Sequence, residues 1–218
     1  PVIDSHQHFW DPSRRAYPWL TDPRLARPFG PDDLRPQLAA HGVDATVLVQ
    51  TVSDVDETRQ FLALAADTDF VAGVVGWVDL ADAHVGQVLA ELKEGEHGRY
   101  LVGIRHQVHD EDDPNWLLRE DVLRGLDAVA GHGLVYDLLV RPRELPAAIT
   151  VARDLPHLRL VIDHLAKPPI ASGEIEPWAA LMHEVADLEH VACKLSGMVT
   201  EAGPGWTVDD LRPYVQRA

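Results

Sequence analysis

Cysteine is almost absent from this sequence: Cys193 is the only one among 218 residues. A single cysteine excludes an intrachain disulfide, so a reducing compartment such as the cytoplasm is the simpler expectation. Basic residues are also scarce, because 19 lysines and arginines face 35 aspartates and glutamates, a formal net charge of -16. Such a chain repels a phosphate backbone and offers it no basic stripe, so we expect no nucleic-acid partner.

Long apolar runs and nucleotide-binding motifs are absent too. No run approaches the roughly 18 to 20 apolar residues of a membrane helix, and no basic stretch followed by an apolar one resembles a secretory signal. No GxGxxG or GxxxxGK[ST] motif follows the first apolar run, which removes the best support for a nucleotide fold. Hydrophobic residues make up 46% of the chain, which is enough for the core of a soluble globular protein without a membrane partner.

Seven β-rich apolar runs alternate with seven amphipathic stretches along the chain. Several of the runs are nearly continuous in Val, Ile and Leu, which is typical of strands buried on both faces in a parallel sheet. Seven βα units in series predict a barrel or a doubly wound sheet, and the missing phosphate motif favours the barrel. The predicted strands are 2–5, 45–50, 71–78, 101–106, 134–140, 158–163 and 190–196, and the predicted helices are 32–41, 55–66, 83–93, 116–132, 144–154, 177–187 and 208–217.

The predicted barrel is one unit short. A full (β/α)8 TIM barrel has eight units and typically about 250 residues, and an open one would expose the edge of a parallel sheet. We therefore expect residues 1–218 to form a single (β/α)8 TIM-barrel domain of the α/β class. Its eighth strand is expected to lie outside the sequence shown, or another element fills the gap.

The first predicted strand runs into the motif His6-Gln7-His8. Side chains alternate faces along a strand, so the two imidazoles point the same way and can share a ligand or a substrate. For an isolated HxH, two unrelated histidines are an equally good explanation. Other polar residues fall at or just beyond predicted strand ends, where barrel enzymes carry their chemistry: Gln50, Trp77, Arg105, His106, Asp137, Asp163, His164 and Lys194.

Arg105 and His164 each have both a functional and a structural interpretation, and each has a neighbour at the same strand end, His106 and Asp163. Arg105 has a planar donor fork that suits a substrate carboxylate or an oxyanion, and its structural alternative is a salt bridge to Asp137. His106 faces away from Arg105 unless a bulge turns it inward. His164 is either a site residue at the end of a buried strand or a satisfied core histidine. Asp163 faces the other way and is expected to cap the next loop or to orient a neighbouring group.

The remaining candidates are charged or aromatic. Asp137 lies among apolar residues, so it needs a partner, which can be an imidazole or Arg105. Lys194 either stabilises an oxyanion or forms a bridge to Asp163. Trp10 and Trp77 either pack in the core and loops or stack on a sugar face.

Five motifs, in order, resemble those of one family: VIDSHQHFWDP, VGIRHQVHDEDDPNWLLREDVLRGL, LVYDLLVRPRELP, LRLVIDHLAKPPI and VACKLSGMVTEA. Together they are similar to the lactonase branch of the amidohydrolase superfamily, which includes L-fuconolactonase-like and L-rhamnonolactonase-like hydrolases. The resemblance runs from Val2 to about Tyr214.

This resemblance implies a barrel hydrolase that opens a lactone ring, commonly that of a sugar-acid (aldono) lactone in carbohydrate catabolism, by adding activated water to the carbonyl. It implies catalytic roles for His6, His8, Arg105 and His164, and an aspartate at the end of strand eight as general base. If one divalent ion, zinc or manganese, is bound, His6, His8 and His164 are its expected ligands, and relatives without metal are also known. The expected substrate-binding residues are Trp10, Trp77, His106, Asp137 and Lys194.

Two other functions remain open at this stage. One is a metal-dependent decarboxylase or amide hydrolase on the same barrel, and the other is a barrel that binds a ligand without turnover. The sequence specifies a small-molecule substrate but not the particular lactone, its ring size, the metal or the oligomeric state.

Overall fold

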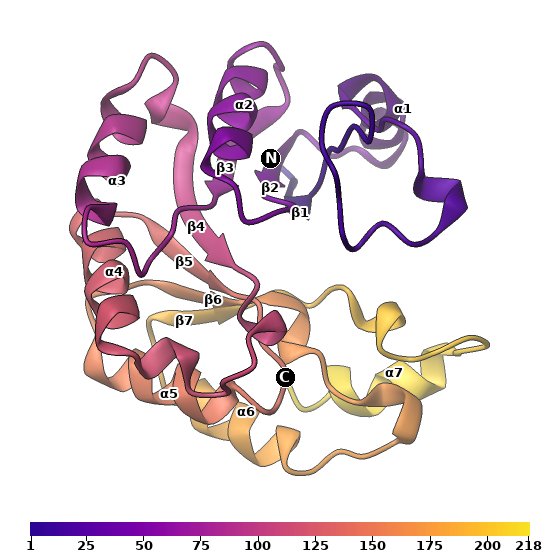
Figure 1. Cartoon of the computed structure of the whole chain (residues 1–218). Helices are drawn as coiled ribbons and strands as arrows, with labels where there is room; N and C mark the ends of the chain where they lie inside the picture. The colour runs from indigo at the N-terminus through magenta and orange to yellow at the C-terminus, as the bar shows by residue number, and fades with distance from the viewer. The chain divides into compact units, whose positions relative to one another are not determined.

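The computed structural model describes residues 1–218, and the chain divides into two compact units. The first unit comprises Pro1–Val78 and Ala90–Gly103, and the second comprises Asp79–Leu89 and Ile104–Ala218. Strands alternate with helices along the whole chain, as the sequence predicts (Figure 1). None of the helices combines the length and the apolar character that crossing a membrane requires.

The strands follow one another in the sheet in sequence order. The pairs β1–β2, β2–β3, β5–β6 and β6–β7 are parallel, which confirms the predicted α/β class and its parallel strands. The carboxyl ends of parallel strands lie at the same edge of the sheet, where the chemistry of such folds is carried. The strands are β1 (Ile3–Gln7), β2 (Ala45–Val49), β3 (Val71–Gly76), β4 (Leu101–His106), β5 (Val135–Leu138), β6 (Leu160–Ile162) and β7 (Val191–Cys193).

Seven helices connect or follow these strands, and one predicted helix is interrupted. The stretch 116–132 contains a 3-10 turn, Trp116–Leu118, and then a separate helix, because Arg119 between them has an extended backbone (φ -63°, ψ 139°). The helices are α1 (Pro31–His41), α2 (Val55–Ala66), α3 (Val85–Glu94), α4 (Glu120–Gly131), α5 (Leu145–Asp154), α6 (Trp178–Ala186) and α7 (Val208–Val215).

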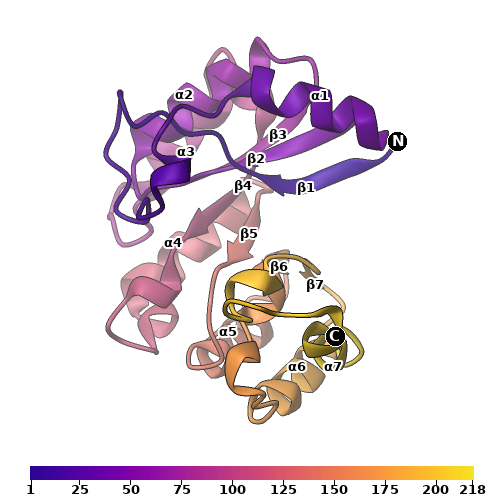
Figure 2. The same cartoon turned by 90° about the vertical axis from the view of Figure 1, so that its right-hand side faces the viewer.

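In the first unit, α1 and α2 lie on one face of β1–β3 (Figure 2). The apolar face of α2, including Phe61, Leu62 and Ala65, is buried, and Leu48 and Val74 in the strands are fully buried. This alternation of apolar strand and amphipathic helix gives the unit its core.

In the second unit, the centre is built from fully buried side chains of β5 and β6 and from the helices that follow them. Tyr136, Leu138 and Ile162 are each at most 1% exposed. The indole of Trp178 in α6 packs against the ring of Tyr214 in α7, with centroids 5.3 Å apart. The prediction that residues 1–218 form one domain stays a prediction.

Helix α1 is followed by Gly42, which has a left-handed backbone conformation that only glycine adopts without strain. Gly42 has φ 65° and its N–H bonds to the carbonyl of Leu38, which is the usual left-handed C-terminal cap. A Cβ built on Gly42 would meet nothing within 4 Å, so the cost of alanine there is conformational alone. Gly86, inside α3, likewise meets nothing within 4 Å but has no positive φ.

We predict that Gly42→Ala lowers the stability of the protein by about 1–2 kcal/mol, the cost of a left-handed backbone with a Cβ. Gly86→Ala should leave it unchanged or raise it by up to about 1 kcal/mol, since alanine is the better helix former. Urea unfolding followed by circular dichroism measures both. Equal effects of the two substitutions would contradict the assignment of Gly42 as a strained cap.

Candidate functional site

Two imidazoles lie together at the carboxyl end of β1 in the first unit. His6 and His8 are half-buried and alternate with the buried Gln7 and Phe9. The Nε2 atoms of His6 and His8 are 3.0 Å apart. Side-chain alternation along the strand therefore brings the two rings to one point, as the HxH spacing predicts.

The protonation of His8 follows from its second contact. Its Nδ1 lies 2.8 Å from the carbonyl oxygen of Val49, at the end of β2. Because a carbonyl can only accept, Nδ1 carries a proton and the Nε2 of the neutral ring offers a lone pair. Zinc with Zn–N bonds of about 2.0–2.1 Å in tetrahedral geometry separates two ligand nitrogens by about 3.3 Å. The separation of 3.0 Å between the two Nε2 atoms is close to this value, so the pair fits a single divalent ion.

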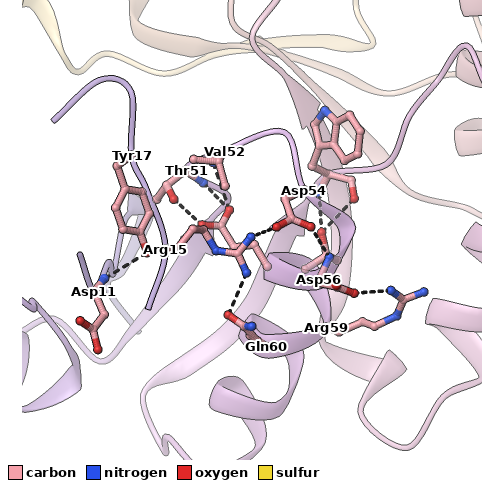
Figure 3. A network of polar contacts seen from close by, with 12 residues as sticks. Asp11, Arg15, Tyr17, Thr51, Val52, Asp54, Asp56, Arg59 and Gln60 are labelled. Atoms are coloured by element: carbon pink, nitrogen blue, oxygen red, sulfur yellow. Dashed lines mark hydrogen bonds and ion pairs between the residues drawn. The ribbon is translucent and has the colours of Figure 1, made fainter. Parts of the chain in front are cut away.

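Polar side chains connect the loop after β1 to α2 and to the residue that caps it (Figure 3). Arg15 forms an ion pair with Asp54 and donates to Oε1 of Gln60 at 3.1 Å. The buried carboxylate of Glu57 accepts from the N–H of Thr51 at 2.7 Å and from the Thr51 hydroxyl. These contacts fix the loops after β1 and β2 relative to each other at the carboxyl ends of their strands.

Trp10 and Trp19 pack against each other in the first unit, with ring centroids 5.5 Å apart. The indole of Trp10 donates to the carbonyl of Leu25 at 2.9 Å and packs on Phe29 with centroids 4.5 Å apart. Trp77 is half-buried. Trp19, which the sequence reasoning did not single out, is 40% exposed, and its indole donates to the carbonyl of Thr51 at 3.1 Å. Contact of Trp10 and Trp77 with a substrate stays a prediction.

Four charged side chains form a buried network in the second unit. Arg105 Nη1 lies 2.9 Å from Oδ2 of Asp163, and Lys194 Nζ lies 2.9 Å from Oδ1 of the same carboxylate. Lys194 also contacts Oδ2 of Asp137 at 2.5 Å. Every member is at most 9% exposed at its side chain. Two cations and two carboxylates balance, which is the condition for burying charges at tolerable cost.

The network resolves two alternatives left open by the sequence. The salt-bridge partner of Arg105 is Asp163, not Asp137. Lys194 bridges to Asp163, as one interpretation has it, and also to Asp137. Burial, aided by the charge of Asp163, raises the pKa of Asp137 to about 6, against the opposing effect of Lys194. Whether these groups contact a substrate stays a prediction.

His106, at the end of β4, is held by two neighbours. Its Nε2 lies 2.7 Å from Oε1 of Glu111, and its ring stacks on Trp116 with centroids 4.4 Å apart and planes 12° apart. The side chain is therefore fixed by an acidic and an aromatic partner from the segment after β4. Its predicted role in substrate binding is not decided by these contacts.

His164 lies in an unusual turn after β6. The backbone from His164 to Lys167 has positive φ at four consecutive residues, 53°, 56°, 56° and 50°, none of them glycine. A left-handed conformation costs roughly 1–2 kcal/mol per residue for an L-amino acid, so the surroundings must hold this turn. The indole of Trp178 donates to the Leu165 carbonyl at 2.6 Å, and Lys167 pairs with Glu201 at 2.5 Å.

The ring of His164 has a hydroxyl partner on the loop after β7. Its Nδ1 lies 2.9 Å from Oγ of Ser196, and the imidazole is half-buried. Ser196 carries no signal that a single sequence reveals. Asp163 does carry one, since it is an acidic residue directly after a buried apolar run, although sequence reasoning assigned it only a supporting position.

Comparison with known proteins identifies a family and relatives that this chain resembles. Residues 3–218 match the family model described as amidohydrolase. The chain is 45% identical over 216 residues to the L-fucono-1,5-lactonase of Burkholderia ambifaria, covering 98% of this chain and 73% of that protein. It is 40% identical over 225 residues to the L-fucono-1,5-lactonase of Burkholderia multivorans, covering 98% and 74%.

Solved structures agree with these sequence matches. An amidohydrolase from Burkholderia multivorans with bound HEPES superimposes with a TM-score of 0.89 at 38% identity, covering 99% of this chain and 77% of that one. A second crystal form of an amidohydrolase from the same species, with bound zinc, gives a TM-score of 0.88 at the same identity and coverage. The fold and the motifs lead to one conclusion: the chain belongs to the amidohydrolase family.

Proposed function

We propose that this protein hydrolyses the lactone ring of a sugar acid, with L-fucono-1,5-lactone as the model substrate. The observation that carries the proposal is the 45% identity to an L-fucono-1,5-lactonase over 98% of the chain. The second such lactonase, at 40% identity, supports the same reaction. The protein is thus a hydrolase of a carboxylic ester bond in a cyclic substrate.

The proposed centre combines groups from the ends of parallel strands. His6 and His8 belong to the end of β1, and His164 follows β6. In (β/α) folds the chemistry is carried at the carboxyl ends of the strands. The family pattern assigns these three imidazoles to one site, and the proposal adopts that assignment.

A divalent ion fits the donors that this site offers. His6 and His8 bring two Nε2 atoms to 3.0 Å, and neutral imidazole is a preferred ligand of zinc. Zinc is present in the related Burkholderia multivorans amidohydrolase. When bound, zinc polarises a carbonyl and lowers the pKa of a water molecule towards about 7. His6, His8 and His164 are the residues that would hold it.

The protein's own cationic groups supply the remaining electrostatics. Ring opening places negative charge on the carbonyl oxygen, and donors aimed at that oxygen stabilise the transition state. The guanidinium of Arg105 has five N–H donors, of which one on Nη1 donates to Asp163. We assign to Arg105 the stabilisation of this oxyanion, with Asp163 holding the guanidinium in place. Lys194, between Asp137 and Asp163, keeps that carboxylate fixed.

We predict that His6→Ala and His8→Ala each lower kcat/KM for L-fucono-1,5-lactone by at least about 100-fold, the order expected for a positioned catalytic group. A pH-indicator assay measures the acid released by ring opening, with a panel of other aldonolactones as substrates. His183→Ala, which removes an exposed imidazole on α6, serves as the matched control and should retain full activity.

The same assay tests the metal. We expect a chelator to abolish activity and added zinc or manganese to restore it. Full activity in chelator would refute the metal while leaving lactone hydrolysis in place. A wild-type protein that opens no aldonolactone at any metal concentration would overturn the proposed function.

Asp137 yields a prediction on the pH dependence of stability. Its pKa in the folded protein, about 6, is above the value of about 3.9 for an unfolded aspartate. The folded state therefore binds the extra proton, and this contribution to stability is complete below about pH 3.9 and is lost as the pH rises through 6. Relative to Asp137→Asn, the wild-type protein should lose on the order of 1 kcal/mol of unfolding free energy between pH 5 and 8.

Urea unfolding of both proteins at pH 5, 6, 7 and 8 provides this comparison. Asp187→Asn, which changes an exposed carboxyl group after α6, should give a curve parallel to that of the wild-type protein. If the unfolding free energy of Asp137→Asn changes with pH in parallel with that of the wild-type protein, the elevated pKa of Asp137 is wrong.

A further inference from the structure

Between Lys194 and Gly197, the segment after β7 contacts both the backbone and the side chains of the turn that carries His164. The N–H of Lys194 donates to the carbonyl of Ile162 at 2.8 Å, and the Lys194 carbonyl accepts from the N–H of Leu165 at 3.3 Å. The Lys194 ammonium meets Asp163 at 2.9 Å. This segment thus binds the turn on both sides of His164.

The next two residues of the segment contact the imidazole itself. Ser196 Oγ is 2.9 Å from Nδ1 of His164. Gly197 adopts φ 65°, and a Cβ built on it would lie 2.5 Å from Cγ and 2.6 Å from Nδ1 of the His164 ring. Real Cβ atoms do not approach this closely, so any side chain at position 197 would displace the ring. The imidazole of His164 occupies the space that a Cβ at position 197 would fill.

We propose that Ser196 and Gly197 are positioning residues that select the tautomer and the orientation of His164 for metal binding. A hydroxyl can donate or accept, and we assign the acceptor role to Ser196 in its contact with Nδ1 of His164. Nδ1 then carries the proton, and the neutral ring presents Nε2 as its ligand atom. A hydrogen bond of this kind to a ligating histidine fixes its ring and tunes its affinity for the metal. The absent Cβ at Gly197 provides the room for the ring in that orientation.

The strained turn explains why such positioning is needed. Four consecutive positive φ values at His164–Lys167 persist only where neighbouring structure over-determines them. A ring on such a backbone depends on its side-chain contacts for its orientation. The contacts from Ser196 and Gly197 supply this constraint directly at the imidazole.

Zinc affinity tests the Ser196 contact without reference to turnover. In competition with a chromophoric chelator, Ser196→Ala should weaken zinc binding by about 10- to 100-fold. Ser196→Thr retains a hydroxyl at the same position and should restore affinity to near the wild-type value. In metal-free protein, long-range nitrogen–proton NMR spectra should show His164 as the Nδ1–H tautomer in the wild type and a loss of that preference in Ser196→Ala.

Gly197 has a matched control within the chain. Gly173 has φ 72° and a Cβ there meets nothing within 4 Å, so Gly173→Ala carries the backbone strain without the collision. Gly197→Ala should weaken zinc binding at least 10-fold more than Gly173→Ala does. Equal losses in the two variants would mean that only backbone strain is involved and would overturn the role of Gly197.

This inference rests on the proposed lactonase site, and the two can fail separately. A wild-type protein that binds no zinc would overturn the inference, whereas lactone opening is scored independently in the pH-indicator assay. Ser196→Ala with a zinc affinity within 2-fold of the wild type and an unchanged His164 tautomer would also overturn it. A wild type that binds zinc but opens no lactone would refute the function and leave the positioning role in place.

Discussion

The carboxylate of Asp163 receives a cation on each of its oxygens, Arg105 on one and Lys194 on the other. Asp137 completes the set through Lys194. Removing four charges from water is costly, and only a balanced, well-paired set makes that burial tolerable. Because the four residues come from β4, β5, the end of β6 and the end of β7, this single electrostatic requirement fixes the carboxyl ends of four strands of the second unit.

The strained turn begins where this network ends. Asp163 is fully buried, and the next residue, His164, starts the run of positive φ values. The backbone energy of that run has to be offset by contacts on either side, and the ion pairs of Asp163 and the contacts of Lys194 provide them. A neutral charge network and an unfavourable backbone are therefore two parts of one local arrangement, which places an imidazole where regular secondary structure would not.

Periodicity in the sequence is enough to locate most elements. The predicted strand 101–106 and helix 55–66 coincide with β4 and α2, because both have strong apolar patterns and clear boundaries. The predicted helix 116–132 is broken at Arg119, whose extended conformation leaves no local sequence signal. The predicted strand 134–140 exceeds β5 by one residue at its start and by two at its end, because the flanking residues are apolar. The predicted strand 158–163 exceeds β6 by two residues at its start and by one at its end.

In the candidate site, too, the sequence predicts the features that depend on local spacing and not those that depend on long-range contacts. The convergence of His6 and His8 follows from two-residue alternation, which continues in the burial pattern from β1 through Phe9 although the strand itself ends at Gln7. The same reasoning points Asp163 away from His164, but it does not apply beyond Ile162, where β6 ends and the left-handed turn begins. The pairing of Asp163 with Arg105 and the contact of Ser196 with His164 join residues 58 and 32 positions apart, and a single sequence contains no record of such pairs.

The contact between His8 and the Val49 carbonyl also determines where a proton goes. With Nδ1 of His8 committed to that carbonyl, the 3.0 Å approach of the two Nε2 atoms is a hydrogen bond only if His6 contributes the hydrogen. In the neutral pair His6 is thus the Nε2–H tautomer. If both rings held a divalent ion through Nε2, this proton of His6 would have to move to Nδ1 of the same ring. The pair would then bind the ion by a change of tautomer, with no net proton released to the solvent.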